Sequence, residues 1–342
     1  MKILVTGGTG FLGQHLVPLL VSQGHQLRLI GRSQPPASLT GVEFVKGDLK
    51  DREAVRRALA DIEVVYHLAG MVAFDPKEAR KMYDLHVAAT RELLREVREV
   101  GTVKRFILAS TSGAIAVSKE ERVGTEEDDY PIEVVGRWPY YTSKIYEERL
   151  TLEFCRQHGI PLVVLNPSLL LGPGDDRLSS TWAVSKFLNR DIPSMPTGGL
   201  SFVDARDAAQ AFANALTRGE LGGRHLFGVN MSFTEFFNRL SRMTGVPTPP
   251  LRLPSKLNLL GGHLMKKWAD LQGREPNLPL HEIEIAEHFF YLDASKAERE
   301  LDFKARDPQE TLYDTVKYIL DRMPPQSLPG LPGKLYESRK GT

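Results

Sequence analysis

Two residues one helical turn apart, Tyr140 and Lys144, have the types and spacing of a proton-transfer pair. The sequence from Trp138 to His158 has a helical pattern, so residues four apart share one face. A phenol with a pKa near ~10 is a poor base at neutral pH, and a nearby ammonium favours tyrosinate. We therefore expect Tyr140 to exchange a proton with an alcohol or carbonyl oxygen while a hydride moves. The same spacing also fits a half-buried tyrosine beside a surface lysine.

Three consecutive hydroxyl side chains, Ser110, Thr111 and Ser112, follow an apolar strand expected over residues 104–109. Ligands of open α/β sheets bind at the carboxyl ends of the strands, where these hydroxyls would lie. One of them would hold a substrate oxygen. Thr111 is our candidate, and Ser110 and Ser112 remain alternatives.

A strand expected over residues 2–6 leads through three spaced glycines into a helix over residues 11–21. Gly7 permits a tight turn, Gly10 lets a pyrophosphate approach the backbone, and Gly13 lets the helix lie close to the sheet. The helix start offers free N–H groups to an anion. We predict a dinucleotide site rather than a purely structural turn, with these contacts: Gly7, Thr9, Gly10, Phe11, Leu12 and Gly13.

The end of the second expected strand, residues 25–30, indicates which dinucleotide is bound. An NAD site usually has a carboxylate here for the ribose 2′-OH, whereas an NADP site has a cation for the 2′-phosphate. This chain has Gly31, Arg32 and Ser33. We therefore favour NADP(H), with Arg32 and Ser33 as contacts. NAD(H) stays possible, because a solvated arginine at a strand end is common.

The remaining expected cofactor contacts also follow strands. Asp48 and Leu49 come after the strand at 42–46, where Asp48 either accepts from an adenine amino group or serves the turn. Small residues after the strand at 63–68 would let the nicotinamide ribose pass. Pro167 and Ser168, after the strand at 161–165, and the pair Tyr140 and Lys144 are also expected to contact the cofactor. The further expected contacts are therefore Asp48, Leu49, Leu68, Ala69, Gly70, Tyr140, Lys144, Pro167 and Ser168.

Composition excludes several classes of function. The 342 residues are 42% hydrophobic, which is enough for one large core or two joined ones. Lys and Arg number 44 against 43 Asp and Glu, so no global charge recruits nucleic acid or a membrane. The single cysteine, Cys155, excludes a disulfide framework, and we expect no metal site. The first strand starts at Lys2 and no apolar run is long enough to span a bilayer, so we expect a cytoplasmic protein.

Strand and helix alternate about six times, which predicts an α/β fold with a doubly wound parallel sheet. We expect residues 1–167 to form a dinucleotide-binding domain, with 200–230 returning to it. Residues 168–199 and 231–325 would form a smaller, mainly helical substrate lobe, and 326–342 a tail. The pocket would lie between the lobes, built partly from loops at 72–76, 113–137 and 172–199.

Taken in order, these motifs resemble the extended short-chain dehydrogenase/reductase superfamily, also called the NAD-dependent epimerase/dehydratase family. The resemblance covers residues 1–325 and rests on Thr6-Gly7-x-x-Gly10-x-x-Gly13, Gly47-Asp48-Leu49, His67-Leu68-Ala69, Ser110-Thr111-Ser112, Tyr140-x-x-x-Lys144, Asn166-Pro167 and Phe202-Val203-Asp204. It implies a Rossmann-type fold, a bound nicotinamide dinucleotide and a catalytic set of Thr111, Tyr140 and Lys144. Arg32 is similar to the dihydroflavonol reductase branch, whose members use NADPH.

The chain departs from the family pattern at two places. His86 stands where an Asn-Val-x-Gly-Thr helix motif commonly has Asn, which puts the local helix distortion and a water relay in doubt. We expect a buried structural histidine there, or one that bonds backbone or water. Sugar-nucleotide members often carry an arginine just before Phe202, for a diphosphate. Here Gly198-Gly199-Leu200-Ser201 precede Phe202, and Arg206 follows it.

Three functions follow from these observations. The leading one is NADPH-dependent reduction of a carbonyl on a small or lipophilic substrate. The alternative is a nucleotide-sugar epimerase or dehydratase, for which Arg177, Arg190, Arg239 or Arg242 would hold the diphosphate. The third is a non-catalytic NADP-sensing protein. The resemblance also implies a homodimer joined through the long helical segments at 77–100 and 138–158.

Overall fold

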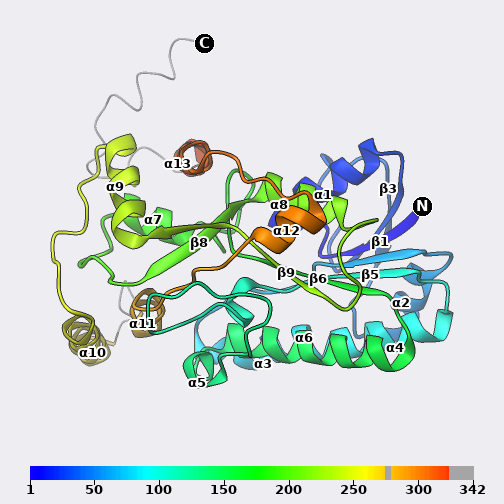
Figure 1. Ribbon diagram of the computed structural model, residues 1–342, viewed down its shortest axis with the longest axis horizontal. Helices are drawn as coiled ribbons and strands as arrows, with labels where there is room; N and C mark the ends of the chain where they lie inside the picture. Colours follow the sequence, from blue (N-terminus) through cyan, green and yellow to red (C-terminus); the bar gives the residue numbers. More distant parts are fainter. Residues whose placement is uncertain (274–278, 323–342) are drawn as a thin grey trace, which may run out of the picture.

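A seven-stranded parallel sheet forms the centre of the computed structural model, which describes residues 1–273 and 279–322 (Figure 1). The strand order is β3-β2-β1-β4-β5-β6-β9, so the order reverses between β1 and β4. Such a reversal opens a crevice at the carboxyl ends of the strands. The strands are β1 (Lys2–Thr6), β2 (Gln26–Gly31), β3 (Val42–Lys46), β4 (Val64–His67), β5 (Arg105–Ala109), β6 (Leu162–Pro167) and β9 (Arg224–Phe227). The predicted Rossmann-type fold is confirmed.

Helices cover both faces of this sheet, as parallel strands buried on both sides require. One face packs on α1 (Phe11–Ser22), α8 (Ala205–Asn214) and α12 (Ser295–Leu301). The other packs on α2 (Arg52–Leu59), α4 (Thr90–Val100) and α6 (Pro139–His158). Two separate apolar cores result, and the central strands β1, β4, β5 and β6 contribute side chains to both.

The long helical segment expected over residues 77–100 is not one regular helix. It consists of η1 (Pro76–Glu78), α3 (Ala79–Tyr83), a π-helical stretch η2 (Asp84–Ala89) and α4. The π-helical stretch contains His86, which is fully buried. Local helix distortion is therefore present although this chain lacks the asparagine of the family motif. Stretches of π-helix occur often at functional sites, and this one contributes to the cavity described below.

A smaller sheet of order β10-β8-β7 lies beside the large one and carries its own core. Only part of the segment 200–230 returns to the large sheet: β9 does, whereas β8 (Gly199–Asp204) pairs with β7 (Leu169–Leu171) and β10 (Val229–Ser232). The reason is packing, because Leu200 and Phe202 of β8 fill the core of this lobe, against Phe236. The lobe is therefore less exclusively helical than expected.

The helices of this second lobe are α7 (Trp182–Leu188), α9 (Phe233–Thr244), α10 (Ser255–Leu271), α11 (Leu280–Ala286) and α13 (Pro308–Arg322). The short elements η3 (Ser112–Ala114) and α5 (Ile132–Val135) belong to the loops between β5 and α6. The expected tail at 326–342 lies outside the described residues. Across residues 1–273 and 279–322, no helix combines the length and apolarity needed to cross a bilayer.

Candidate active site

One cavity of about 1440 Å³ opens along the carboxyl ends of the central strands, between the large sheet and the second lobe. Every residue that the sequence nominated for cofactor binding or catalysis lines it. They come from seven separate segments of the chain: Gly7, Thr9, Gly10, Phe11, Leu12, Gly13, Arg32, Ser33, Asp48, Leu49, Leu68, Ala69, Gly70, Thr111, Tyr140, Lys144, Pro167 and Ser168. The fold thus brings the predicted set to one place.

The glycine turn between β1 and α1 is packed too tightly for larger residues. Gly7 has φ of +70°, and a Cβ there would meet the backbone of Ala69 at 2.6 Å. A Cβ on Gly13 would meet the Gly8 backbone at 2.5 Å. The N-cap of α1, Gly10, provides no side-chain bond to the first turn of the helix. The N–H groups at the start of α1 therefore face the cavity and suit an anion.

At the far end of the cavity, Arg32 and Ser33 are exposed directly after β2. Asp48 also lines this end, and its Oδ1 accepts a hydrogen bond of 2.9 Å from the Lys50 backbone N–H. The turn role that we held open for Asp48 is therefore present. A contact with adenine stays a prediction.

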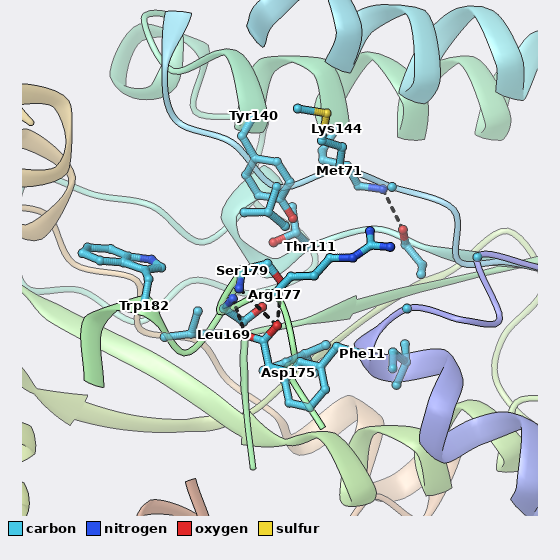
Figure 2. Close-up of a pocket in the computed structure, with 18 of the residues that line it drawn as sticks. Phe11, Met71, Thr111, Tyr140, Lys144, Leu169, Asp175, Arg177, Ser179 and Trp182 are labelled. Atoms are coloured by element: carbon cyan, nitrogen blue, oxygen red, sulfur yellow. Dashed lines mark hydrogen bonds between the residues drawn. The ribbon is translucent and has the colours of Figure 1, made fainter. Parts of the chain in front are cut away.

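Tyr140, Lys144 and Thr111 meet at the other end (Figure 2). The Tyr140 hydroxyl hydrogen-bonds to the Thr111 side chain, and Lys144 Nζ donates to the Ala109 carbonyl over 2.7 Å. Burial raises the pKa of Tyr140, while the Lys144 ammonium and the Thr111 hydrogen bond act to lower it. The fold thus gathers the phenol, the ammonium and a strand-end hydroxyl at one end of the cavity.

The structure distinguishes the three neighbouring hydroxyls. Ser110 Oγ donates to the buried carboxylate of Glu148, which also accepts from Asn166 Nδ2 at 2.8 Å. Ser112 is buried and begins η3. Thr111 is the one of the three that contacts the Tyr140 hydroxyl. Geometry therefore favours Thr111 for the substrate oxygen.

A buried carboxylate that the sequence analysis missed, Glu147, forms an ion pair with Lys144. Glu147 Oε1 also accepts from Thr90 Oγ1 at 3.2 Å, and Thr90 Oγ1 lies 2.8 Å from His67 Nε2. Burial on its own would raise the pKa of Glu147, but Lys144 and the His67 hydrogen bond keep it lowered. The signal in the sequence was an acid three residues after Lys144, on the same helix face.

That buried network continues to the glycine turn. His67 Nδ1 lies 2.7 Å from Thr6 Oγ1, and Thr6 Oγ1 accepts from the Ala69 backbone N–H at 3.2 Å. All its side chains are buried, so water does not compete for these bonds. Helix α6 and the end of β1 are therefore held in fixed relation across the sheet.

His86 connects the loop after β4 to the helix that carries Tyr140. Its Nε2 accepts a 3.0 Å hydrogen bond from the Met71 backbone N–H, so the ring proton sits on Nδ1 and points to Ser143 Oγ at 2.8 Å. Ser143 Oγ in turn donates to the Tyr140 carbonyl at 2.8 Å. The expected buried histidine that bonds backbone is confirmed. Burial lowers the pKa of His86 to about 4.

The loop after β7 forms another wall of the cavity and contains Arg177 (Figure 2). Asp175 is buried and its carboxylate accepts from the backbone N–H groups of Ser179, Ser180 and Thr181 at 2.7–3.1 Å. These bonds take up the backbone N–H groups just before α7, which begins at Trp182. Of the four arginines named for a diphosphate, all within the described residues, only Arg177 lines the cavity.

Aromatic and aliphatic side chains dominate the part of the cavity walled by the second lobe. The Phe74 ring lies between Tyr140 and Trp182, with ring centroids 5.9 Å and 6.4 Å away. The wall includes Phe74, Trp182, Phe233, Phe237, Ile283 and Phe290. Glu282 also lines it, and burial raises its pKa to about 7. This region suits an apolar ligand that carries little charge.

The sequence was compared with protein families and with known proteins. The family model described as "NAD dependent epimerase/dehydratase family" matches residues 3–227. A Synechocystis sp. protein, whose name assigns it provisionally to dihydroflavonol 4-reductase, is 31% identical over 92% of this chain and 93% of its own length. Sterol demethylase protein B of Methylococcus capsulatus is 29% identical over 94% of this chain and 99% of its own length.

Solved structures show the same fold. The crystal structure of gox2253 superposes with a TM-score of 0.80 at 25% identity, covering 94% of this chain and 98% of the other. A UDP-glucose 4-epimerase from Thermotoga maritima, solved with UDP-glucose, superposes with a TM-score of 0.72 at 23% identity. This superposition covers 94% of this chain and 99% of the other.

His86 makes a pH-dependent contribution to stability that can be tested. Its pKa falls from 6.5 unfolded to about 4 folded, so the unfolded chain takes up the proton first as the pH drops. The neutral His86 imidazole therefore makes its full contribution to the free energy of unfolding above pH ~6.5, and this contribution is lost as the pH falls towards ~4. We measure the free energy of unfolding by urea denaturation at about pH 7.5 and at about pH 5. Between these two pH values the wild type should lose about 2 kcal/mol more of this free energy than the His86→Asn variant loses. The exposed control His263→Asn should follow the wild type, and parallel curves for His86→Asn would contradict the prediction.

Proposed function

Because the chain belongs to the NAD dependent epimerase/dehydratase family and is an NAD(P)-dependent enzyme, we propose that it reduces a carbonyl group on a lipophilic substrate with NADPH. The observation that carries this proposal is the apolar wall that ends at Tyr140, through Phe74 and Trp182. In this assignment residues 1–167 and β9 bind the dinucleotide. Residues 168–199 and 231–325 bind the substrate.

The residues at the inner end of the cavity divide the chemistry of a reductase between them. NADPH, when bound, supplies the hydride. The Thr111 hydroxyl holds the carbonyl oxygen of the substrate, and Tyr140 donates the proton that the developing alkoxide needs. Lys144 opposes the effect of burial on the phenol and makes the proton easier to release. Glu147 holds Lys144 in place as a positioning residue.

The chain's own residues fit a dinucleotide. A Cβ on Gly10 would lie only 3.2 Å from the Gly7 carbonyl oxygen, so glycine keeps the start of α1 bare, and the Ser168 hydroxyl is buried without a hydrogen-bond partner in the described part of the chain. Both line the cavity. Arg32 supports NADP(H), since its guanidinium follows β2 where a 2′-phosphate would be bound and Gly31 and Ser33 bring no carboxylate.

The alternative, a nucleotide-sugar epimerase or dehydratase, needs cations for a diphosphate in the second lobe. Arg177 is one, but Glu282 lines the same region and Arg206 is engaged by Asp204 and Asp314. A carbonyl panel read by NADPH consumption separates the two functions. No consumption on any carbonyl, with a UDP- or dTDP-sugar that raises the melting temperature, would favour the epimerase. No turnover on either class of substrate would favour the NADP-sensing protein.

Tyr140→Phe tests the proposed proton donor. Removing the hydroxyl should lower kcat by at least about 100-fold, the range of general acid catalysis, while the Kd of NADPH changes less than about threefold. The matched control is Tyr141→Phe, because the neighbouring phenol packs on Phe290 and Trp138. It should keep most activity. Unchanged kcat in Tyr140→Phe would remove this residue from the mechanism.

Arg32→Ala tests the choice of cofactor. A charge-assisted hydrogen bond to the 2′-phosphate contributes about 1.5–3 kcal/mol, so the Kd of NADPH should rise about 10–100-fold while that of NADH stays nearly constant. Fluorescence titration of the reduced cofactors measures both. Arg91→Ala, on the exposed side of α4, is the control. If the Kd of NADPH and the Kd of NADH rise by the same factor, Arg32 does not bind the 2′-phosphate.

We also propose a homodimer joined through α4 and α6. Its support is the resemblance and an exposed aromatic on α6, Tyr146, whose ring centroid lies 6.0 Å from that of Tyr83. Light scattering should give about twice the 38.3 kDa mass of the chain, and Tyr146→Arg should lower that value. Tyr313→Arg, equally exposed on α13, should not. A concentration-independent monomer would refute the dimer.

The cytoplasm is the compartment that we propose for this enzyme. The support is the chain's one cysteine: Cys155 is buried, and burial raises the pKa of its thiol, so it behaves as a core residue. A chain with one cysteine forms no internal disulfide and gains nothing from an oxidising compartment. Fractionation of cells that produce the full chain would check this assignment.

A further inference from the structure

Helix α10 carries a row of leucines on its outer side. They are spaced three, four and seven residues apart, so they share one side of the helix. Their exposed fractions are 49% for Leu257, 54% for Leu260, 60% for Leu264 and 86% for Leu271. Trp268, 57% exposed, belongs to the same row. Four exposed leucines along one side of a 17-residue helix are more than scattered surface residues explain.

The helix is anchored by a different side. Asn258, Gly262 and Ala269 are buried, and Gly262 packs against Leu280 and Ile283 of α11. Asn258 Nδ2 donates to the Glu287 carboxylate at 2.9 Å, which fixes the rotation of α10. The four leucines therefore lie away from the side of α10 that these residues hold to the protein.

The charge around this row is positive. Residues 252–273 contain four cations, Arg252, Lys256, Lys266 and Lys267, and one carboxylate, Asp270, although the whole chain has a net charge of only +1. Lys256 and Lys267 are exposed. A polar face rich in lysine beside a leucine and tryptophan face is the composition of helices that lie in a membrane interface.

Helix α10 lies at the surface of the second lobe, close to the apolar part of the cavity. In Figure 1 α10 lies at the edge of the second lobe, beside α11 and remote from the strands β1 and β3. Residues Glu282, Ile283 and Ala286 of α11 line the cavity on its other side. One short helix thus separates the leucine row from the apolar part of the candidate active site.

We propose that α10 docks on an anionic membrane surface, with its leucine row in the acyl boundary and its lysines at the headgroups. Anionic lipids of the cytoplasmic leaflet attract such cations. This occupant fits better than a second copy of the chain, because a stable protein interface uses about 20–30 residues a side and the row has five. The expectation of no membrane partner rested on net charge and on the lack of a spanning apolar run, and neither of these reveals a local surface patch.

Sedimentation with lipid vesicles tests the proposal on the full chain. The wild type should bind vesicles of phosphatidylcholine with 30% phosphatidylglycerol at least about fivefold better than vesicles of phosphatidylcholine alone. Leu260→Glu with Leu264→Glu should abolish binding to both. Lys256→Glu with Lys267→Glu should lower binding to the anionic vesicles. Neither change touches the cavity, so the Kd of NADPH should stay at the wild-type value and report intact folding.

The matched control is Val123→Glu with Leu221→Glu, two positions equally exposed elsewhere, which should bind vesicles like the wild type. The proposal fails if the wild type does not sediment, or if the control loses as much binding as the leucine variant. It also fails if the leucine variant only lowers the mass seen by light scattering, because the row is then a subunit contact. None of these readouts needs turnover, so a failure here is distinct from a failure of the proposed reductase.

Discussion

The buried ion pair of Lys144 and Glu147 is the constraint on which the candidate site depends. An ammonium removed from water is costly unless a partner and hydrogen bonds compensate it, and breaking such a pair commonly costs about 3–5 kcal/mol. Here the Glu147 carboxylate and the Ala109 carbonyl both accept from Lys144. The chain therefore has to bring α6 against the end of β5 before Lys144 can be buried at all.

The same requirement extends through the sheet. Glu147 is tied to Thr90 of α4, Thr90 to His67 of β4, and His67 to Thr6 of β1. Each member is buried, so leaving one unpaired would cost the whole desolvation of that group. The site is thus held by hydrogen bonds between elements that are far apart in sequence. The π-helical turn adds a second tie, since it places His86 between Met71 and Ser143.

The second lobe contributes shape and surroundings. Its own core, with Phe202 against Phe236, lets it pack as a unit beside the large sheet. The cavity between them is polar where the strands end, aromatic where α7 and α9 approach, and mostly aliphatic along α11. Such a division suits a charged dinucleotide at one end and an apolar substrate at the other. The leucine row of α10 continues this apolar character to the surface.

By itself the sequence predicted the fold class and the residues that line the candidate site. The glycine spacing, the strand-end hydroxyls and the Tyr140–Lys144 spacing are local patterns, and local patterns depend on backbone sterics and helix periodicity that no distant residue changes. Tertiary structure decided what depends on contacts across the chain: the partner of Lys144, the partner of Ser110, the membership of β8 in a second sheet, and the break at Asp84–Ala89. Those outcomes follow from burial and from satisfying buried polar groups, and both are properties of the packed chain rather than of any one segment.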